Sequence, residues 1–183
     1  MRVRPPSSSA IHLFLITLLL IAQIFSLVPV LGHAQPTSSP PDYGIYLQKG
    51  DEWIRLHYLA AKRVPVGEMG YVIGILHRTR VFLIGERAEL RISDRQPAIY
   101  FYGANPADFY TLVRLERKDG LREFHYSIYP LGGSAQVVDD YLVKVQIERI
   151  GKDLYRLTPS QELAPGEYGV LLGDSIYPFG IDG

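Results

Sequence analysis

The sequence predicts an all-β protein, an antiparallel β-sandwich that is Ig-like in general architecture, following a cleaved signal peptide. Apolar and polar residues alternate repeatedly after residue 43, and turn-forming pairs separate the alternating runs. No segment beyond the N-terminus keeps a helical period over about ten residues. Period-two alternation is typical of strands with one buried face, and many short strands joined by close turns indicate a sandwich or a small barrel.

The first residues have the order of a signal peptide. Arg2 and Arg4 precede an almost wholly apolar run from Ile11 to Leu31, and Ala34 ends a small-x-small cleavage site. We therefore expect a signal peptide at 1–34, a flexible Pro/Ser linker at 35–42 and a single β-sandwich domain at 43–183. An uncleaved anchor is the alternative, because the apolar run is long enough to span a bilayer.

The composition predicts an exported protein, periplasmic or extracellular, that relies on its apolar core. The chain has no cysteine, which excludes a disulfide framework, a thiolate metal site and a cysteine nucleophile. Without Arg2 and Arg4, the basic side chains are slightly outnumbered by the 19 acidic ones. The charges are scattered, so we expect no nucleic-acid partner and, after signal cleavage, no membrane contact.

The strands are expected where the alternation is regular. In Tyr141–Glu148 the apolar side chains fall at 141, 143, 145 and 147, and Arg122–Ile128 alternates in the same way. The other predicted strands, rich in Tyr, Val, Ile and Phe, are Phe82–Ile84, Ala98–Tyr102, Tyr110–Arg117, Tyr155–Thr158, Glu167–Leu172 and Ile176–Ile181.

The turns are expected where Gly, Asp and Asn gather. Asp119-Gly120 predicts a hairpin, because both of its residues tolerate positive φ. Asn105-Pro106 predicts a short helical turn that ends near Phe109, with Asn105 as its N-cap. Pro178 lacks a ladder donor and suits an edge strand or an unpaired position. Further turns are predicted at Gly50-Asp51, Gly132-Gly133, Gly151-Lys152-Asp153 and Gly173-Asp174.

An ordered set of short motifs covers about half of the chain, over residues 85–182. They read P-x-x-Y-F-Y at 97–102, L-V-R-L at 112–115, R-E-F at 122–124, L-x-P-G-E-Y at 163–168 and F-G-I-D at 179–182. This order resembles a group of secreted bacterial β-sandwich proteins of uncharacterised function. The resemblance implies export and a sandwich, and it carries over no catalytic residue.

The sequence shows no catalytic or metal-binding motif. Outside the predicted signal peptide the histidines are His57, His77 and His125, and none has metal-ligand spacing with another. Gly173-Asp174-Ser175 resembles the start of a lipase block, but no histidine follows it to activate the serine. We expect no metal and no cofactor. A small hydrolase would need a site assembled from these distant histidines and a carboxylate.

Aromatic residues are the one feature that suggests binding. Tyr100 and Tyr102 lie on one face of a predicted strand, and Trp53 is the only tryptophan. Exposed, these three side chains would stack on a sugar or anchor a protein; buried, they would fill a core. We predict a non-catalytic module with a protein-interaction or structural role, and a carbohydrate-binding module as the alternative. The expected partner is a protein or a glycan.

Overall fold

The strands form two sheets. The computed structural model describes residues 39–66, 77–128 and 136–183. The first sheet has the order β11–β12–β7–β1–β2, and all of its neighbours are antiparallel. Its strands are β1 (Gly44–Lys49), β2 (Glu52–Arg55), β7 (Ile99–Tyr102), β11 (Val145–Gly151) and β12 (Leu154–Pro159).

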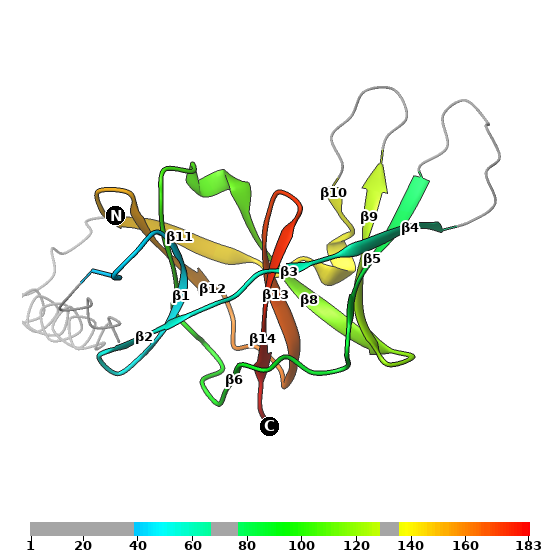
Figure 1. The fold of residues 1–183 in the computed structure, drawn as a ribbon, viewed down its shortest axis with the longest axis horizontal. Helices are drawn as coiled ribbons and strands as arrows, with labels where there is room; N and C mark the ends of the chain where they lie inside the picture. Colours follow the sequence, from blue (N-terminus) through cyan, green and yellow to red (C-terminus); the bar gives the residue numbers. More distant parts are fainter. Residues whose placement is uncertain (1–38, 67–76, 129–135) are drawn as a thin grey trace, which may run out of the picture. The chain divides into compact units, whose positions relative to one another are not determined.

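The second sheet has the order β3–β14–β13–β8–β9–β5–β4, with β10 paired to β9 and β6 paired in parallel to β14. Figure 1 shows β13 and β14 between the first sheet on one side and β5 and β9 on the other. The strands are β3 (Leu59–Ala60), β4 (Lys62–Val66), β5 (His77–Ile84), β6 (Arg91–Ile92), β8 (Tyr110–Lys118), β9 (Leu121–Ile128), β10 (Gln136–Val137), β13 (Gly166–Leu172) and β14 (Ser175–Ile181).

The second sheet nearly closes into a barrel because one short segment reaches both of its ends. β3 pairs with β14, and β4 pairs with β5 at the far end of the strand order, with only Ala61 between them. β8 makes the bend, since Tyr110–Leu115 pair with β13 and Glu116–Lys118 pair with β9. The prediction of an all-β, antiparallel architecture is confirmed, but the second sheet curls round where a sandwich layer would stay open.

Two apolar interiors lie on opposite faces of β8, β13 and β14. The inter-sheet core packs these strands against the first sheet and consists of Ile45, Leu47, Leu56, Ile99, Phe101, Tyr110, Leu112, Leu157, Leu163, Tyr168, Val170, Phe179 and Ile181. The barrel core packs their other face against β5 and β9 and consists of Val81, Leu83, Val113, Leu115, Phe124, Leu171 and Ile176.

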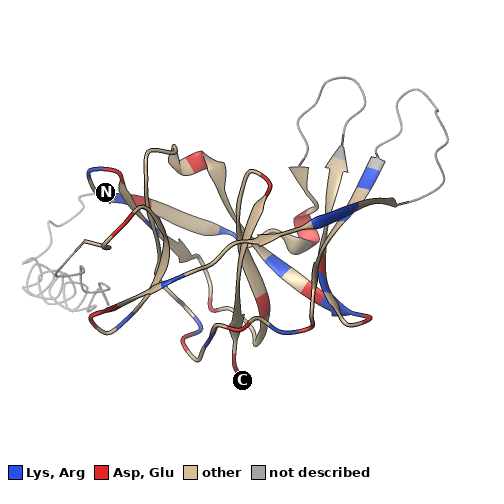
Figure 2. Cartoon of the chain, in the orientation of Figure 1, with Lys and Arg blue, Asp and Glu red and all other residues tan. Residues whose placement is uncertain are grey.

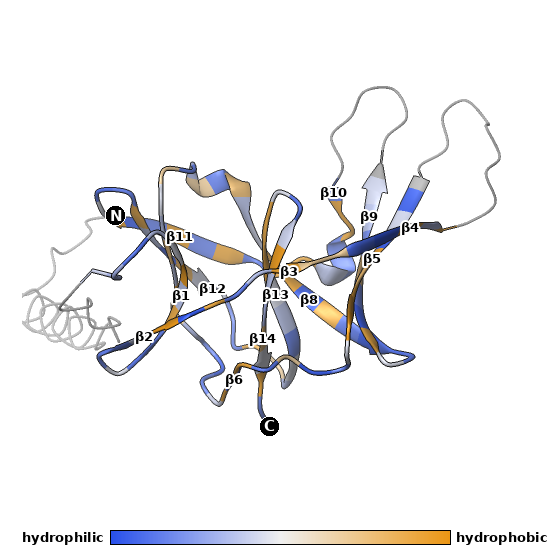
Figure 3. Ribbon diagram, viewed as in Figure 1, coloured by the Kyte–Doolittle hydropathy of each residue, from blue (hydrophilic) through white to orange (hydrophobic). Residues whose placement is uncertain are grey.

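Strands with one buried face and strands with two buried faces have different burial patterns along the sequence. From Val145 to Glu148 of β11 the side chains alternate between half-buried and exposed, and β11 shows bands of apolar and polar residues in Figure 3. In β13 every residue from Glu167 to Leu171 is buried. Tyr168 and Val170 enter the inter-sheet core and Leu171 enters the barrel core, because successive side chains point to opposite faces. A strand covered on both faces therefore loses its alternating pattern.

Most of the predicted turns are confirmed. Asp119 and Gly120 have φ of 52° and 77° and join β8 to β9. Gly50 joins β1 to β2 and Gly173 joins β13 to β14, both with positive φ, and Asp153 does the same between β11 and β12. Residues 1–38 and Gly132-Gly133 lie outside the described residues, so the signal peptide stays a prediction.

Two local predictions need correction. The expected strand Tyr141–Glu148 begins only at Val145, because Asp139–Tyr141 forms a 3₁₀ turn. Val143 still packs on the inter-sheet core as the alternation predicted, whereas Tyr141 packs on the barrel core. The helical turn Ala107–Phe109 is present, but its N-cap position is Pro106 without a side-chain cap, so Asn105 as N-cap is wrong.

Pro178 occupies the kind of position that was predicted for it. On one side it faces Gly169 of β13, and on the other β3 and β6 leave a gap at Tyr177–Phe179. The Gly180 N–H, two residues on, points to the gap side and bonds the Leu90 carbonyl at 2.9 Å. The donor that proline lacks would therefore point into the gap, so its absence breaks no ladder bond.

Candidate functional site

Trp53 and Tyr100 meet on the outer face of the first sheet. Tyr100 lies opposite Tyr46 in the β1–β7 register, and the Trp53 ring stands edge-on to Tyr100 with ring centroids 4.9 Å apart and an interplanar angle of 90°. Tyr100 is only 1% exposed, whereas Trp53 is half-buried. Burial raises the pKa of Tyr100, against the nearby Arg156 that lowers it. Tyr100 thus contributes packing to this face, and Trp53 is the member that reaches solvent.

Tyr102 belongs to a second aromatic pair on this sheet. It meets Tyr43 edge-on at 4.8 Å and 86°, and Tyr43 is 58% exposed. Sequence reasoning missed Tyr43 as a site residue, because only the strand register places Gly44 opposite Tyr102. The perpendicular rings do not form a flat stacking platform, so binding by Trp53, Tyr100 and Tyr102 stays a prediction.

The three histidines lie apart. His57 is exposed on the segment between β2 and β3, and the backbone of His77 pairs with Ile128 at the start of β5. His125 lies on β9 opposite Arg80. The structure brings none of the three together, and the described residues contain no group of three or more His, Asp and Glu that could hold a metal ion.

His125 does share one face of β9 with a buried carboxylate. Glu123 is 3% exposed and is ion-paired with Arg80, and its other oxygen lies 3.8 Å from His125 Nε2. The Tyr141 hydroxyl donates to Glu116 at 3.3 Å, and its ring covers His125 with a centroid distance of 5.4 Å. The contacts of Tyr141 with Glu116 and His125 anchor the Asp139–Tyr141 turn to the sheet, and His125 Nε2 is buried without a hydrogen-bond partner.

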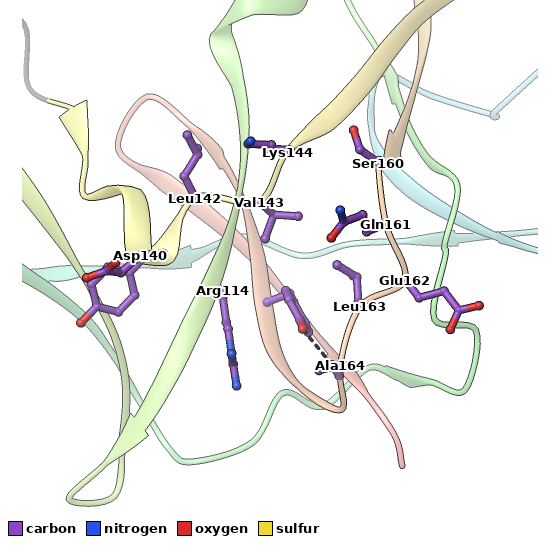
Figure 4. Close-up of a pocket in the computed structure, with 12 residues that line it drawn as sticks. Arg114, Asp140, Leu142, Val143, Lys144, Ser160, Gln161, Glu162, Leu163 and Ala164 are labelled. Atoms are coloured by element: carbon purple, nitrogen blue, oxygen red, sulfur yellow. Dashed lines mark hydrogen bonds between the residues drawn. The ribbon is translucent and has the colours of Figure 1, made fainter.

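A cleft of about 390 Å³ lies between two segments that each connect one sheet to the other. One wall is Asp140–Lys144, which bonds β8 through the Val143 N–H to the Leu112 carbonyl (3.0 Å) before it enters β11. The other is Ser160–Ala164, between β12 and β13. The Ser160 N–H joins the walls by donating to the Lys144 carbonyl at 2.9 Å. Figure 4 shows the side chains of both walls around the cleft.

The cleft combines an apolar interior with charges of both signs. Val143, Leu163 and Tyr168 supply apolar surface, and Leu142 at the edge is 44% exposed. Arg114 and Lys144 lie among the lining residues together with Asp140 and Glu162. Ser160 is the hydroxyl side chain of one wall, but no histidine or cysteine is found among the described lining residues to activate it. This arrangement provides contact surface and hydrogen-bonding groups.

A hydrogen bond at the base of the cleft fixes the corner between β12 and β13. The Tyr168 hydroxyl donates to the Ala164 carbonyl, four residues earlier, at 2.8 Å. Burial raises the pKa of Tyr168, which keeps the phenol protonated and able to donate. This is the geometry of a tyrosine corner, in which a tyrosine near the start of a strand bonds the backbone just upstream.

Comparison with known proteins finds no family model, no curated protein and no solved structure that matches the chain. Within the described residues, no helix has the length and apolar character needed to cross a bilayer.

Proposed function

We propose that this chain is an exported, non-catalytic β-domain that binds a polypeptide segment of a partner protein. The observation that carries the proposal is the cleft between Asp140–Lys144 and Ser160–Ala164. Its apolar surface suits side chains of an extended peptide, and its cations and carboxylates suit the peptide's polar groups.

The tyrosine corner supports an Ig-like sandwich as the architecture of the inter-sheet half. Tyr168 and Ala164 fall in the L-x-P-G-E-Y motif at 163–168, and the same motif contributes to the resemblance to secreted bacterial sandwich proteins. We propose that the first sheet with β8, β13 and β14 forms this sandwich, and that the barrel closure is an addition to it.

Export rests on residues 1–34. Cleavage between Ala34 and Gln35 is expected, and N-terminal sequencing of material exported by a bacterial host checks it. A membrane-bound chain that keeps Ile11–Leu31 would support the anchor instead.

The peptide-binding proposal is tested with a displayed library of random peptides. A selected peptide is titrated into the wild-type chain, into Leu142→Asp and into Val64→Asp. Leu142 lines the cleft and is 44% exposed. Val64 on β4 is similarly exposed, at 47%, and lies outside the cleft lining. We expect Leu142→Asp to weaken binding by about tenfold or more, because it places a charge at an apolar contact of the cleft, and Val64→Asp to leave it unchanged. Equal binding by all three proteins would reject the cleft.

Glycan binding is the second candidate, and the exposed Tyr43 beside Tyr102 is the observation that favours it. A glycan array tests it, with Tyr43→Ala and Trp53→Ala as variants. A glycan ligand whose affinity falls in these variants and not in Leu142→Asp would favour a carbohydrate-binding module.

A further inference from the structure

A second hollow, of about 420 Å³, lies away from the cleft at the gap beside Pro178. One side is the segment that passes from β2 to β3, with Arg55 and His57 among the lining residues. The other is the segment that follows β5, with Arg87 and Glu89. β14 is unpaired here between β3 and β6, so the strand edge leaves room between the two segments.

Arg122 of β9 forms part of the wall of this hollow, and it is 3% exposed. Its Nε donates to the Gly85 carbonyl at 2.9 Å and its Nη2 to the Ile84 carbonyl at 3.4 Å. Nη1 is buried without a hydrogen-bond partner. Burial lowers the pKa of Arg122 below its usual value, yet a guanidinium remains charged at neutral pH. Arg122 is therefore a buried cation without a salt bridge to any described carboxylate, although Glu167 and Glu89 attract it through space.

Of the carboxylates at this end of the barrel, Glu89 is exposed, whereas Glu167 and Asp182 bond to other residues. Glu167 accepts from the Ala88 N–H at 2.7 Å and from Arg91 at 2.6 Å, and Asp182 accepts from Arg91 at 2.6 Å. The cross-strand neighbour of Arg122 on β8 is Arg117, a like charge. The attraction of Glu167 and Glu89 offsets part of the cost of burying this charge, but Nη1 still lacks an acceptor. A buried donor without an acceptor is unfavourable, so this end of the barrel gains free energy when an anion supplies one.

We propose that this hollow binds a small anionic molecule through a carboxylate or phosphate group that Arg122 recognises. Arg55 and Arg87 line the same hollow, and Glu89 is the one carboxylate among its described lining residues. Asp42 and Asp182 pair with Arg55 and Arg87 from outside the lining, each at 3.8 Å. A guanidinium offers paired donors to either oxyanion, and the apolar side chains of Leu56, Leu90 and Pro178 are placed to contact the rest of the molecule. The site is separate from the peptide cleft and does not depend on the function proposed for it.

The test is calorimetric titration of the full-length chain with inorganic phosphate, citrate and galacturonate, with neutral galactose as control. We expect at least one anion to bind with a dissociation constant of about 1 mM or lower, and galactose not to bind. Phosphate binding alone would identify a phosphate group, and binding of citrate or galacturonate would identify a carboxylate. Higher salt should weaken the binding.

Three variants locate the site. Arg122→Met removes the buried charge, Arg87→Glu reverses a charge that is 63% exposed, and Arg114→Met removes an exposed arginine in the peptide cleft. Arg122→Met and Arg87→Glu should each weaken binding by about tenfold or more, and Arg114→Met should leave it unchanged. If Arg122→Met does not fold, Arg87→Glu against Arg114→Met decides. The proposal is overturned if no anion binds the wild-type chain, or if Arg87→Glu and Arg122→Met bind as the wild type does.

Discussion

The inter-sheet core and the barrel core share β8, β13 and β14 but are built differently. In both cores the clustered buried side chains are apolar or tyrosine, and in the inter-sheet core the rings stack, with Phe101 and Tyr110 at 3.8 Å and 14°. The three buried charged residues of the described chain, Arg122, Glu123 and Glu167, all lie on strands of the second sheet. Charges of both signs also follow the β8–β9 hairpin in Figure 2.

The difference follows from how each interior is closed. Two sheets packed face to face exclude water with side chains alone. A barrel has open ends, and here the segment after β5 crosses one of them, held by the bonds from Glu167 to Ala88 and Arg91. Gly180 leaves room for that arrangement, because a Cβ at this position would collide with the Arg91 guanidinium. The barrel end is thus closed by ionic and backbone contacts, and it is where Arg122 Nη1 is buried without a hydrogen-bond partner.

Removing the strand that serves both interiors should have the largest effect. Deletion of residues 174–183 removes Ile176 from the barrel core and Phe179 and Ile181 from the inter-sheet core. Each such side chain stabilises a fold by about 1.5–3 kcal/mol when buried, so the sum approaches a domain's whole stability. We expect no cooperative thermal transition by circular dichroism. A melt close to that of the full chain would show that β14 is dispensable.

Two leucines of β8 compare the interiors directly. Leu112 lies in the inter-sheet core and Leu115 in the barrel core, and both are fully buried. Replacement by Ala should lower the free energy of unfolding by about 2–5 kcal/mol, with the larger loss at Leu112. The barrel end beside Leu115 holds charged groups and can admit water, so its cavity is filled more easily. Urea denaturation measures both, and the reverse order would contradict this contrast.

Glu167→Gln tests the ionic closure of the barrel. It keeps an acceptor for Ala88 but loses the charge that pairs with Arg91, and we expect a loss of about 2–4 kcal/mol in the free energy of unfolding. The matched control is Glu148→Gln, whose exposed ion pair with Arg156 should contribute less than about 1 kcal/mol. Hydrogen exchange should show faster exchange at Ala88 in the first variant only. Equal losses at the two sites would mean that burial does not set the strength of the pair.

Alkaline pH should destabilise both interiors. Burial raises the pKa of Tyr110 and Tyr168 in the inter-sheet core and of Tyr126 beside the barrel core. Their contribution is complete below the unfolded pKa of about 10 and is lost as pH rises toward the folded values, by up to about 1.4 kcal/mol per tyrosine for each pH unit. Denaturation from pH 8 upward should show a decline beginning near pH 10. The exposed Tyr43 and Tyr58 should ionise while the protein is still folded. Absorbance showing that all 13 tyrosines ionise before the fold is lost would show that the buried rings are accessible.

The smallest expected effect on stability tests which side chains of the Asp140–Lys144 wall point into the core. Val143 is half-buried against the inter-sheet core and Lys144 is exposed. Val143→Asp should lower the free energy of unfolding by about 1–3 kcal/mol, and Lys144→Asp by less than about 0.5 kcal/mol. Equal shifts in the denaturant midpoint would place the alternation out of register by one residue.

Local pattern was enough to predict the all-β class, most strands and their turns. Asp119-Gly120 forms a hairpin because both residues adopt positive φ, which is a local preference. Val143, Val145 and Ile147 all face the core because side chains in a strand alternate with a period of two. The same alternation wrongly placed Tyr141 in this strand. The chain forms a 3₁₀ turn there, and the Tyr141 ring packs against His125 of β9. The closure of the barrel through β3 and β4 depends on pairings across the whole chain, which no local pattern encodes.

The sequence by itself therefore determined which segments extend and where they turn, since φ preferences and alternation act over a few residues. Only the tertiary structure decided what each side chain meets. It buried Tyr100 against Trp53, left Tyr43 exposed, and buried Arg122 with its Nη1 lacking a hydrogen-bond partner. These outcomes depend on which strands become neighbours, and burial and charge pairing are properties of that arrangement.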